Sequence, residues 1–75
     1  MNKPYFTPYF TVLEKLPENR YWGIAFGSYS KAEAKQEIRD LSEYAHTLTK
    51  FRIIETGDMQ TQINSAVVTI NEKEN

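Results

Sequence analysis

The side chains that could carry catalysis are few in this chain and are scattered along it. His46 is the single histidine and cysteine does not occur, which excludes disulfides, thiolate metal sites and a multi-histidine metal site. Glu14, Glu55 and Asp58 fall at expected strand ends and in a turn, where paired carboxylates could act as acid and base. No phosphate-binding glycine cluster, nucleophile elbow or dinucleotide fingerprint accompanies them. We therefore predict no enzymatic activity, no metal and no cofactor.

Length and composition favour one small domain. A core built from 75 residues rarely supplies more than about 3–5 kcal/mol by itself, so either an aromatic-rich core or oligomerisation is expected to add stability. Five Tyr, four Phe and one Trp provide that aromatic surface. The net charge of −1 indicates no general attraction to nucleic acid or to an anionic membrane.

The chain has neither an apolar window of about 18 residues nor the apolar core of a signal peptide near Met1. We therefore expect a cytoplasmic protein with no membrane association.

The first half of the chain predicts an antiparallel hairpin. Tyr9–Leu16 is rich in β-formers, and Pro17 with Asn19 favours a turn before a second strand over residues 20–26. In that second strand Trp22, Ile24 and Phe26 alternate with Gly and Ala, which predicts one large apolar face and one nearly bare face.

A capped helix and a third strand are expected next. Ser30 and Glu33 have the spacing of a capping box, and a helix over residues 31–47 places an apolar stripe on one side, formed by Ala34, Ile38, Leu41, Ala45 and Leu48. His46 falls on the polar side near the helix C-terminus, where the helix dipole favours its cationic form, so we interpret it as a surface residue. Residues 49–56 favour a β-strand, ended by Gly57 and Asp58.

The predicted fold class is therefore α+β, a single small domain with an antiparallel-rich sheet and one helix packed on one face. Residues 1–8 form an extended lead-in, 9–56 a β-β-α-β core, 57–65 a polar loop, 66–71 a fourth strand and 72–75 a frayed tail. The other sheet face is expected to stay open. The predicted core is Val12, Trp22, Ile24, Phe26, Ala34, Ile38, Leu41, Ala45, Phe51 and Ile53.

Protein binding is the function that this pattern favours most. Spare strand edges can accept a partner strand, and Tyr and Trp often dominate interfaces. The candidate interaction surface is Tyr9, Tyr21, Tyr29, Arg52 and Ile54, with a homodimer or a host protein as the expected partner. Single-stranded nucleic-acid binding on an aromatic sheet face is the alternative, although the chain lacks a basic cluster and an RNA-recognition aromatic motif.

One longer pattern resembles known sequences. Trp22-x-Ile24-x-Phe26-Gly27-x-Tyr29-Ser30, followed by Glu33-Ala34 and by residues 51–54, is similar to a pattern in many small uncharacterised phage and mobile-element proteins. The resemblance covers roughly residues 20–55. It implies a phage- or plasmid-encoded accessory protein that binds and inhibits a host factor, and it implies no catalytic residues.

Overall fold

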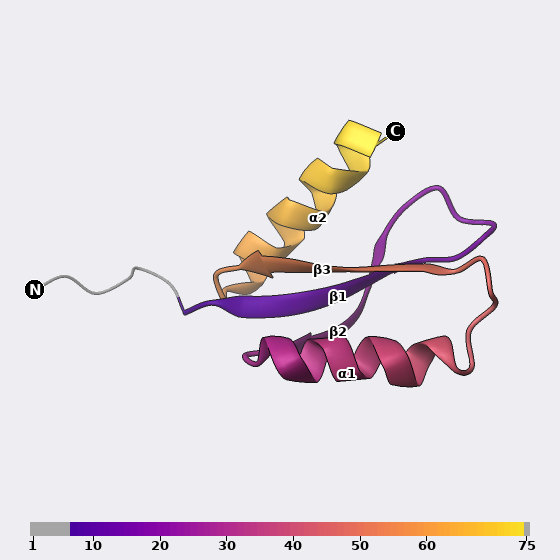
Figure 1. Cartoon of the computed structure of the whole chain (residues 1–75). Coiled ribbons are helices and arrows are strands. Elements are labelled where there is room, and N and C mark those ends of the chain that lie inside the picture. Colours follow the sequence, from indigo (N-terminus) through magenta and orange to yellow (C-terminus); the bar gives the residue numbers. More distant parts are fainter. Residues whose placement is uncertain (1–6, 75) are drawn as a thin grey trace, which may run out of the picture.

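The computed structural model describes residues 7–74. Its elements in chain order are β1 (Tyr9–Lys15), β2 (Gly23–Ser28), α1 (Lys31–Ser42), β3 (Lys50–Thr56) and α2 (Gln60–Glu74) (Figure 1). The mixed α+β class with an antiparallel sheet is confirmed, and residues 9–56 follow the expected β-β-α-β order.

The sheet has the strand order β2-β1-β3, and β1 pairs antiparallel with both neighbours. Seven consecutive residue pairs join β1 to β3 without a shift in register. Thr11, Val12 and Leu13 of β1 are fully buried, because a central strand is covered by neighbours on both edges and by a helix on each face. The centre of β1 is therefore the centre of the core.

Strand β2 contains a β-bulge that the sequence pattern does not reveal. Val12 of β1 pairs with Phe26, whereas the next residue, Leu13, pairs with Ile24, so Ala25 is the extra residue in β2. Side chains directly opposite each other in a sheet share a face, and the bulge therefore places Ile24 and Phe26 on opposite faces. The predicted single apolar face of β2 is wrong for this reason.

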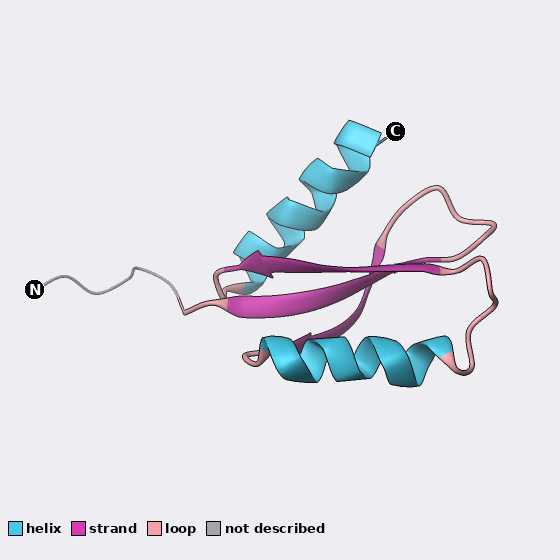
Figure 2. Cartoon of the chain, viewed as in Figure 1, coloured by secondary structure: helices cyan, strands magenta, loops and turns pink. Residues whose placement is uncertain are grey.

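Helix α1 packs on one face of the sheet and begins where the sequence indicates (Figure 2). The Ser30 hydroxyl accepts a hydrogen bond from the Glu33 amide, as expected for an N-cap. The Glu33 carboxylate does not complete a capping box, since it accepts a bond from the Ser28 hydroxyl at 2.6 Å, while the Ser30 amide donates to that same hydroxyl oxygen. Ala34 is fully buried, and this small residue lets α1 lie close to the strands.

Helix α1 ends at Ser42, five residues before the expected end at Thr47. Leu48, the last residue of the predicted stripe, is 66% exposed, so extending the helix would bury little apolar surface. The Leu48 amide donates to Nδ1 of His46, and the Thr49 amide donates to the His46 carbonyl oxygen. His46 is exposed, as expected, and it shapes the turn that leads into β3.

The largest correction concerns the C-terminal part of the chain. Residues 60–74 form α2, so the predicted polar loop over 57–65 and fourth strand over 66–71 are wrong, and residues 72–74 are helical rather than frayed. The strand-favouring Val67, Val68 and Ile70 are compatible with a helix because tertiary packing overrides weak propensities. The Met59 amide donates to the Gln62 side chain, which is half of a capping box built without a Ser or Thr.

Helix α2 crosses the sheet face opposite α1, so the sheet lies between two helices (Figure 1). The expected open face is therefore partly covered. Ile63 of α2 and Leu13 of β1 are buried although the predicted core did not include them. Ile24, which the predicted core included, is 49% exposed. Val12, Trp22 and Ala34 are buried as expected, and Phe26, Ile38, Leu41, Ala45, Phe51 and Ile53 are partly buried.

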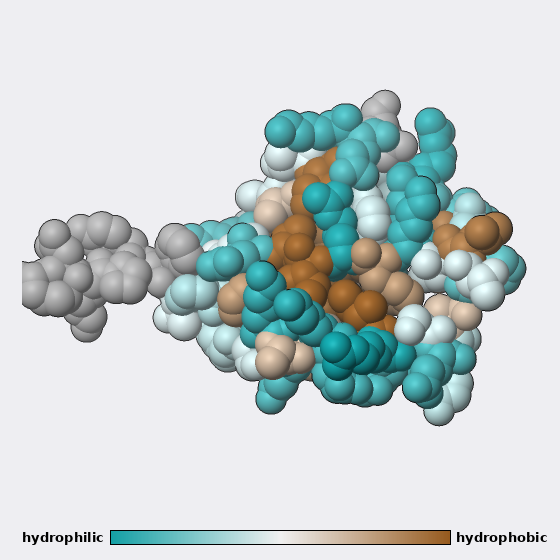
Figure 3. All heavy atoms as spheres, in the orientation of Figure 1, coloured by the Kyte–Doolittle hydropathy of each residue, from teal (hydrophilic) through white to brown (hydrophobic). Residues whose placement is uncertain are grey.

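Figure 3 shows hydrophobic side chains gathered between the two helices, surrounded by hydrophilic residues. Among residues 7–74, no helix combines the length and the apolar character that crossing a membrane requires.

Candidate interaction surface

The five residues expected to form an interaction surface are distributed over three places. Tyr9 and Tyr29 are in contact with each other, and Tyr21 is exposed in the loop before β2. Arg52 and Ile54 lie on β3, on the sheet face that α2 crosses. The geometry brings only the two tyrosines of the first group into direct contact.

Tyr9 and Tyr29 form an edge-to-face aromatic pair. Their ring centroids are 4.9 Å apart at an interplanar angle of 78°, a favourable arrangement for two rings. Tyr9 lies over Gly27, where an added Cβ would come within 2.8 Å of Tyr9 Cζ, so the missing side chain of Gly27 makes room for the ring. The Tyr29 hydroxyl donates to Asp58 at 3.0 Å, and this hydrogen bond to a carboxylate raises the pKa of Tyr29.

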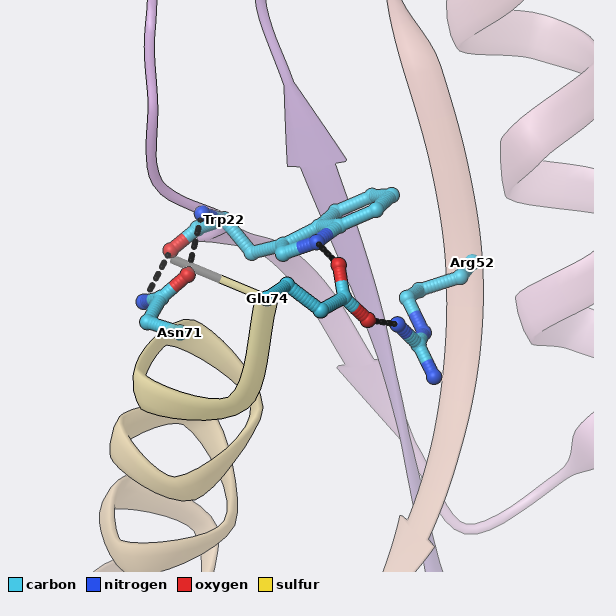
Figure 4. A network of polar contacts seen from close by, with 4 residues as sticks. All are labelled: Trp22, Arg52, Asn71 and Glu74. Atoms are coloured by element: carbon cyan, nitrogen blue, oxygen red, sulfur yellow. Dashed lines mark hydrogen bonds and ion pairs between the residues drawn. The ribbon is translucent and has the colours of Figure 1, made fainter.

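Arg52 belongs to a polar network that fastens α2 to the sheet, hereafter the Trp22 network, formed by Trp22, Arg52, Asn71 and Glu74 (Figure 4). The indole N–H of Trp22 donates to one carboxylate oxygen of Glu74 at 2.9 Å, and the Arg52 guanidinium donates to the other at 2.6 Å. The guanidinium carbon also lies 5.4 Å from the Trp22 ring centroid, within cation–π range. Arg52 is thus engaged within the chain.

Asn71 holds the backbone of Trp22 with both ends of its amide. The Trp22 amide donates to Asn71 Oδ1 at 2.7 Å, and Asn71 Nδ2 donates to the Trp22 carbonyl oxygen at 3.2 Å. Such a bidentate contact substitutes for a strand pairing at the residue just before β2. Sequence reasoning missed Asn71 and Glu74, because their three-residue spacing identifies one helix face only once a helix is recognised there.

The Trp22 network also changes the acidity of Glu74. The hydrogen bond from Trp22, followed by that from Arg52, holds the pKa of Glu74 below its ordinary value. The ionised carboxylate lies in the last turn of α2, where the helix dipole disfavours an anion, so the two donors compensate for an otherwise unfavourable position.

Both β2 and β3 have an outer edge that none of the described strands pairs with. The edge of β2 carries Tyr21, Gly23, Ile24 and Tyr29, hereafter the β2 edge surface. Tyr21, Ile24 and Tyr29 are all large and exposed. Nothing lies within 4 Å of a Cβ built on Gly23. None of the described strands pairs with this side of β2, so its outward backbone groups are available to another chain.

A hollow of about 170 Å³ adjoins this edge, hereafter the β2 hollow. It lies between β2 and the first half of α2 and is lined by Tyr9, Thr11, Ile24, Ala25, Phe26, Gly27, Gln60 and Ile63. The Thr11 hydroxyl in its wall is buried and has no hydrogen-bond partner. The hollow is large enough for one side chain of a bound segment.

The described part of the chain brings no set of three His, Asp or Glu side chains together that could hold a metal ion. Comparison with protein-family models, with curated proteins and with solved structures gives no match. The geometry of the molecule is therefore the basis for a functional proposal.

Proposed function

We propose that this protein is a small non-enzymatic protein-binding module that adds a strand of its partner to the outer edge of β2. The single observation that carries the proposal is the free edge of β2 with the β2 hollow beside it. Strand addition derives affinity from main-chain hydrogen bonds and specificity from pockets that receive alternate side chains. The β2 edge surface offers the unpaired backbone groups, and the β2 hollow offers a pocket for a side chain.

The aromatic residues at the two ends of this edge support the same function. Tyr21 precedes β2 and Tyr29 follows it, and both side chains are exposed. Exposed tyrosines contribute strongly to protein interfaces. The partner in this proposal is a second copy of the chain or a host protein, and the resemblance to phage and mobile-element proteins favours an accessory protein that inhibits a host factor.

The β-bulge in β2 restricts which partner fits. A bulge increases the local twist of an edge strand and discourages indiscriminate pairing. A bound strand therefore has to follow that twist, and its side chain next to Ala25 would point toward the β2 hollow. The sheet face invoked for nucleic-acid binding is crossed by α2, and its Arg52 is paired with Glu74, so no observation favours that alternative.

The test compares two variants that place a charge on similarly exposed aliphatic positions. Ile24→Asp alters the β2 edge surface, and Val68→Asp alters α2, where the side chain is 54% exposed. Solution mass by light scattering and quantitative co-purification from host extract are measured for both. We expect wild type and Val68→Asp to form the same assembly and Ile24→Asp to lose it. Equal behaviour of the two variants, or a wild-type monomer that retains no protein, would contradict the proposal.

A further inference from the structure

A second hollow lies at the end of the sheet where β1 ends and β3 begins. It has a volume of about 280 Å³ and is lined by Lys15, Leu16, Pro17, Asn19, Leu48 and Lys50, hereafter the lysine hollow. The loop after β1 and the loop before β3 form its walls. Its lining contains two cationic residues and no carboxylate.

The two lysines face each other across the sheet. Lys15 and Lys50 are the last residue pair in the register between β1 and β3, and like charges directly opposite each other destabilise a sheet. Neither ammonium forms an ion pair with a carboxylate of residues 7–74. The fold therefore tolerates a repulsive pair that one substitution would remove.

The charges around Lys15 and Lys50 compensate only part of the repulsion between the two ammonium groups. Lys15 Nζ lies 5.8 Å from the Trp22 ring centroid, and Lys15 interacts electrostatically with Glu74. Glu74 is already bonded to Trp22 and Arg52. Lys50 is exposed, and its ammonium forms no ion pair or ring contact with residues 7–74. An anion placed between the two ammonium groups would convert the repulsion into attraction.

The remaining lining residues indicate what kind of anion fits. Leu16, Pro17 and Leu48 are exposed apolar residues at the rim, and the side-chain amide of Asn19 can donate a hydrogen bond. We propose that the lysine hollow binds a small organic anion, with an oxyanion head such as phosphate between Lys15 and Lys50 and a short apolar part against Leu16 and Leu48. This site does not depend on the proposed protein-binding function.

The experiment titrates the full chain with hexyl phosphate, and separately with inorganic phosphate, at constant ionic strength, while amide chemical shifts are followed by NMR. We expect saturable shifts at residues 15–19 and 48–50, with hexyl phosphate binding more tightly than inorganic phosphate. Leu48→Ala is expected to weaken hexyl phosphate binding and to leave inorganic phosphate binding unchanged. Shifts that do not saturate, or that spread over all lysines, would overturn the proposal.

Two double variants with the same change in net charge provide the decisive comparison. Lys15→Gln with Lys50→Gln removes the cations of the lysine hollow, and Lys31→Gln with Lys35→Gln removes two exposed cations of α1. We expect the first to weaken hexyl phosphate binding by about tenfold or more, as for the loss of a charge-assisted hydrogen bond, and the second to have little effect. Equal weakening by both would show that only general electrostatic attraction is involved and would overturn the site.

Discussion

Trp22 links α2 to the sheet through both its backbone and its side chain. Its side chain is 9% exposed, and it is linked through its backbone to Asn71 and through its indole to Glu74. These contacts connect residues 49 and 52 positions apart in the chain. Trp22, just before the edge strand β2, thereby fixes the C-terminal end of α2.

At the residue scale, the titration of Glu74 is a direct test of the Trp22 network. Because the folded state lowers the pKa of Glu74, its ionised form stabilises the fold above the ordinary glutamate value of about 4.3, and this contribution is lost as the pH falls through the lower folded value. We expect the NMR signal of the Trp22 indole N–H to shift with a midpoint below the ordinary pKa of a glutamate.

Glu74→Gln is the matched control for this titration, because its side chain keeps an acceptor for the indole and cannot ionise. We expect the pH-dependent shift of the indole signal to disappear in this variant. A wild-type midpoint at or above the ordinary value would show that the contacts of Trp22 and Arg52 with Glu74 are not maintained in solution.

At the element scale, α2 is held by a narrow apolar stripe as well as by the Trp22 network. Ile63 is 6% exposed, whereas Val68 on the same helix is 54% exposed. We expect Ile63→Ala to lower the free energy of unfolding by about 2–4 kcal/mol, as for other buried aliphatic truncations. Val68→Ala should change it by less than about 0.5 kcal/mol.

Chemical denaturation followed by circular dichroism measures both variants. An Ile63→Ala protein as stable as Val68→Ala would mean that Ile63 is not buried beside the β2 hollow as described.

The elements differ in how far the sequence could predict them. Helix α1 was predictable because its start is encoded locally by Ser30, and the hairpin because Pro17 and Asn19 mark its turn. Helix α2 was not, because Val67, Val68 and Ile70 favour a strand locally and only the contacts of Ile63, Asn71 and Glu74 with distant residues decide the outcome. Local pattern carries no information about such contacts.

The bulge was equally invisible to pattern reasoning. The alternation of large and small residues through Phe26 is regular, and only the pairing with Val12 and Leu13 reveals the extra residue, Ala25. Of the candidate site residues, Tyr21 and Tyr29 are exposed, and whether they bind a partner stays a prediction. The contact of Arg52 with Glu74 could not be predicted, because it depends on a helix that the sequence did not predict.

At the scale of the whole molecule, the described core is small. Weak interactions at the surface therefore have a relatively large effect on the free energy of unfolding. Its buried apolar residues are Val12, Leu13, Trp22, Ala34 and Ile63, which is consistent with the marginal stability of a domain of this size. The repulsion between Lys15 and Lys50 acts on this limited stability. We interpret this repulsion as a destabilising feature that is kept because the two lysines bind an anion.

Lys50→Glu should therefore stabilise the molecule while removing its anion site. An opposite-charge pair across two strands contributes roughly 0.2–1 kcal/mol, which corresponds to a rise in Tm of about 1–8 °C for a domain of this size. Lys50→Gln should give a smaller rise, because it removes the repulsion without adding attraction. Thermal unfolding monitored by circular dichroism measures both changes.

If both Lys50 variants unfold at a lower temperature than wild type, the interpretation of the lysine pair as a destabilising feature kept for anion binding is wrong. A higher Tm together with lost hexyl phosphate binding would establish the expected exchange of stability for function.

The Trp22 network has a spectroscopic consequence. The chain contains one tryptophan, and its indole donates to a carboxylate of α2 and lies near the cations of Lys15 and Arg52. The tryptophan fluorescence of the protein therefore arises at the junction of α2 with the sheet. Any partner or ligand that displaces α2 would move this fluorophore from a charged, enclosed setting into water and change its emission. The protein thus carries a built-in optical reporter of its own helix docking, which needs no added label.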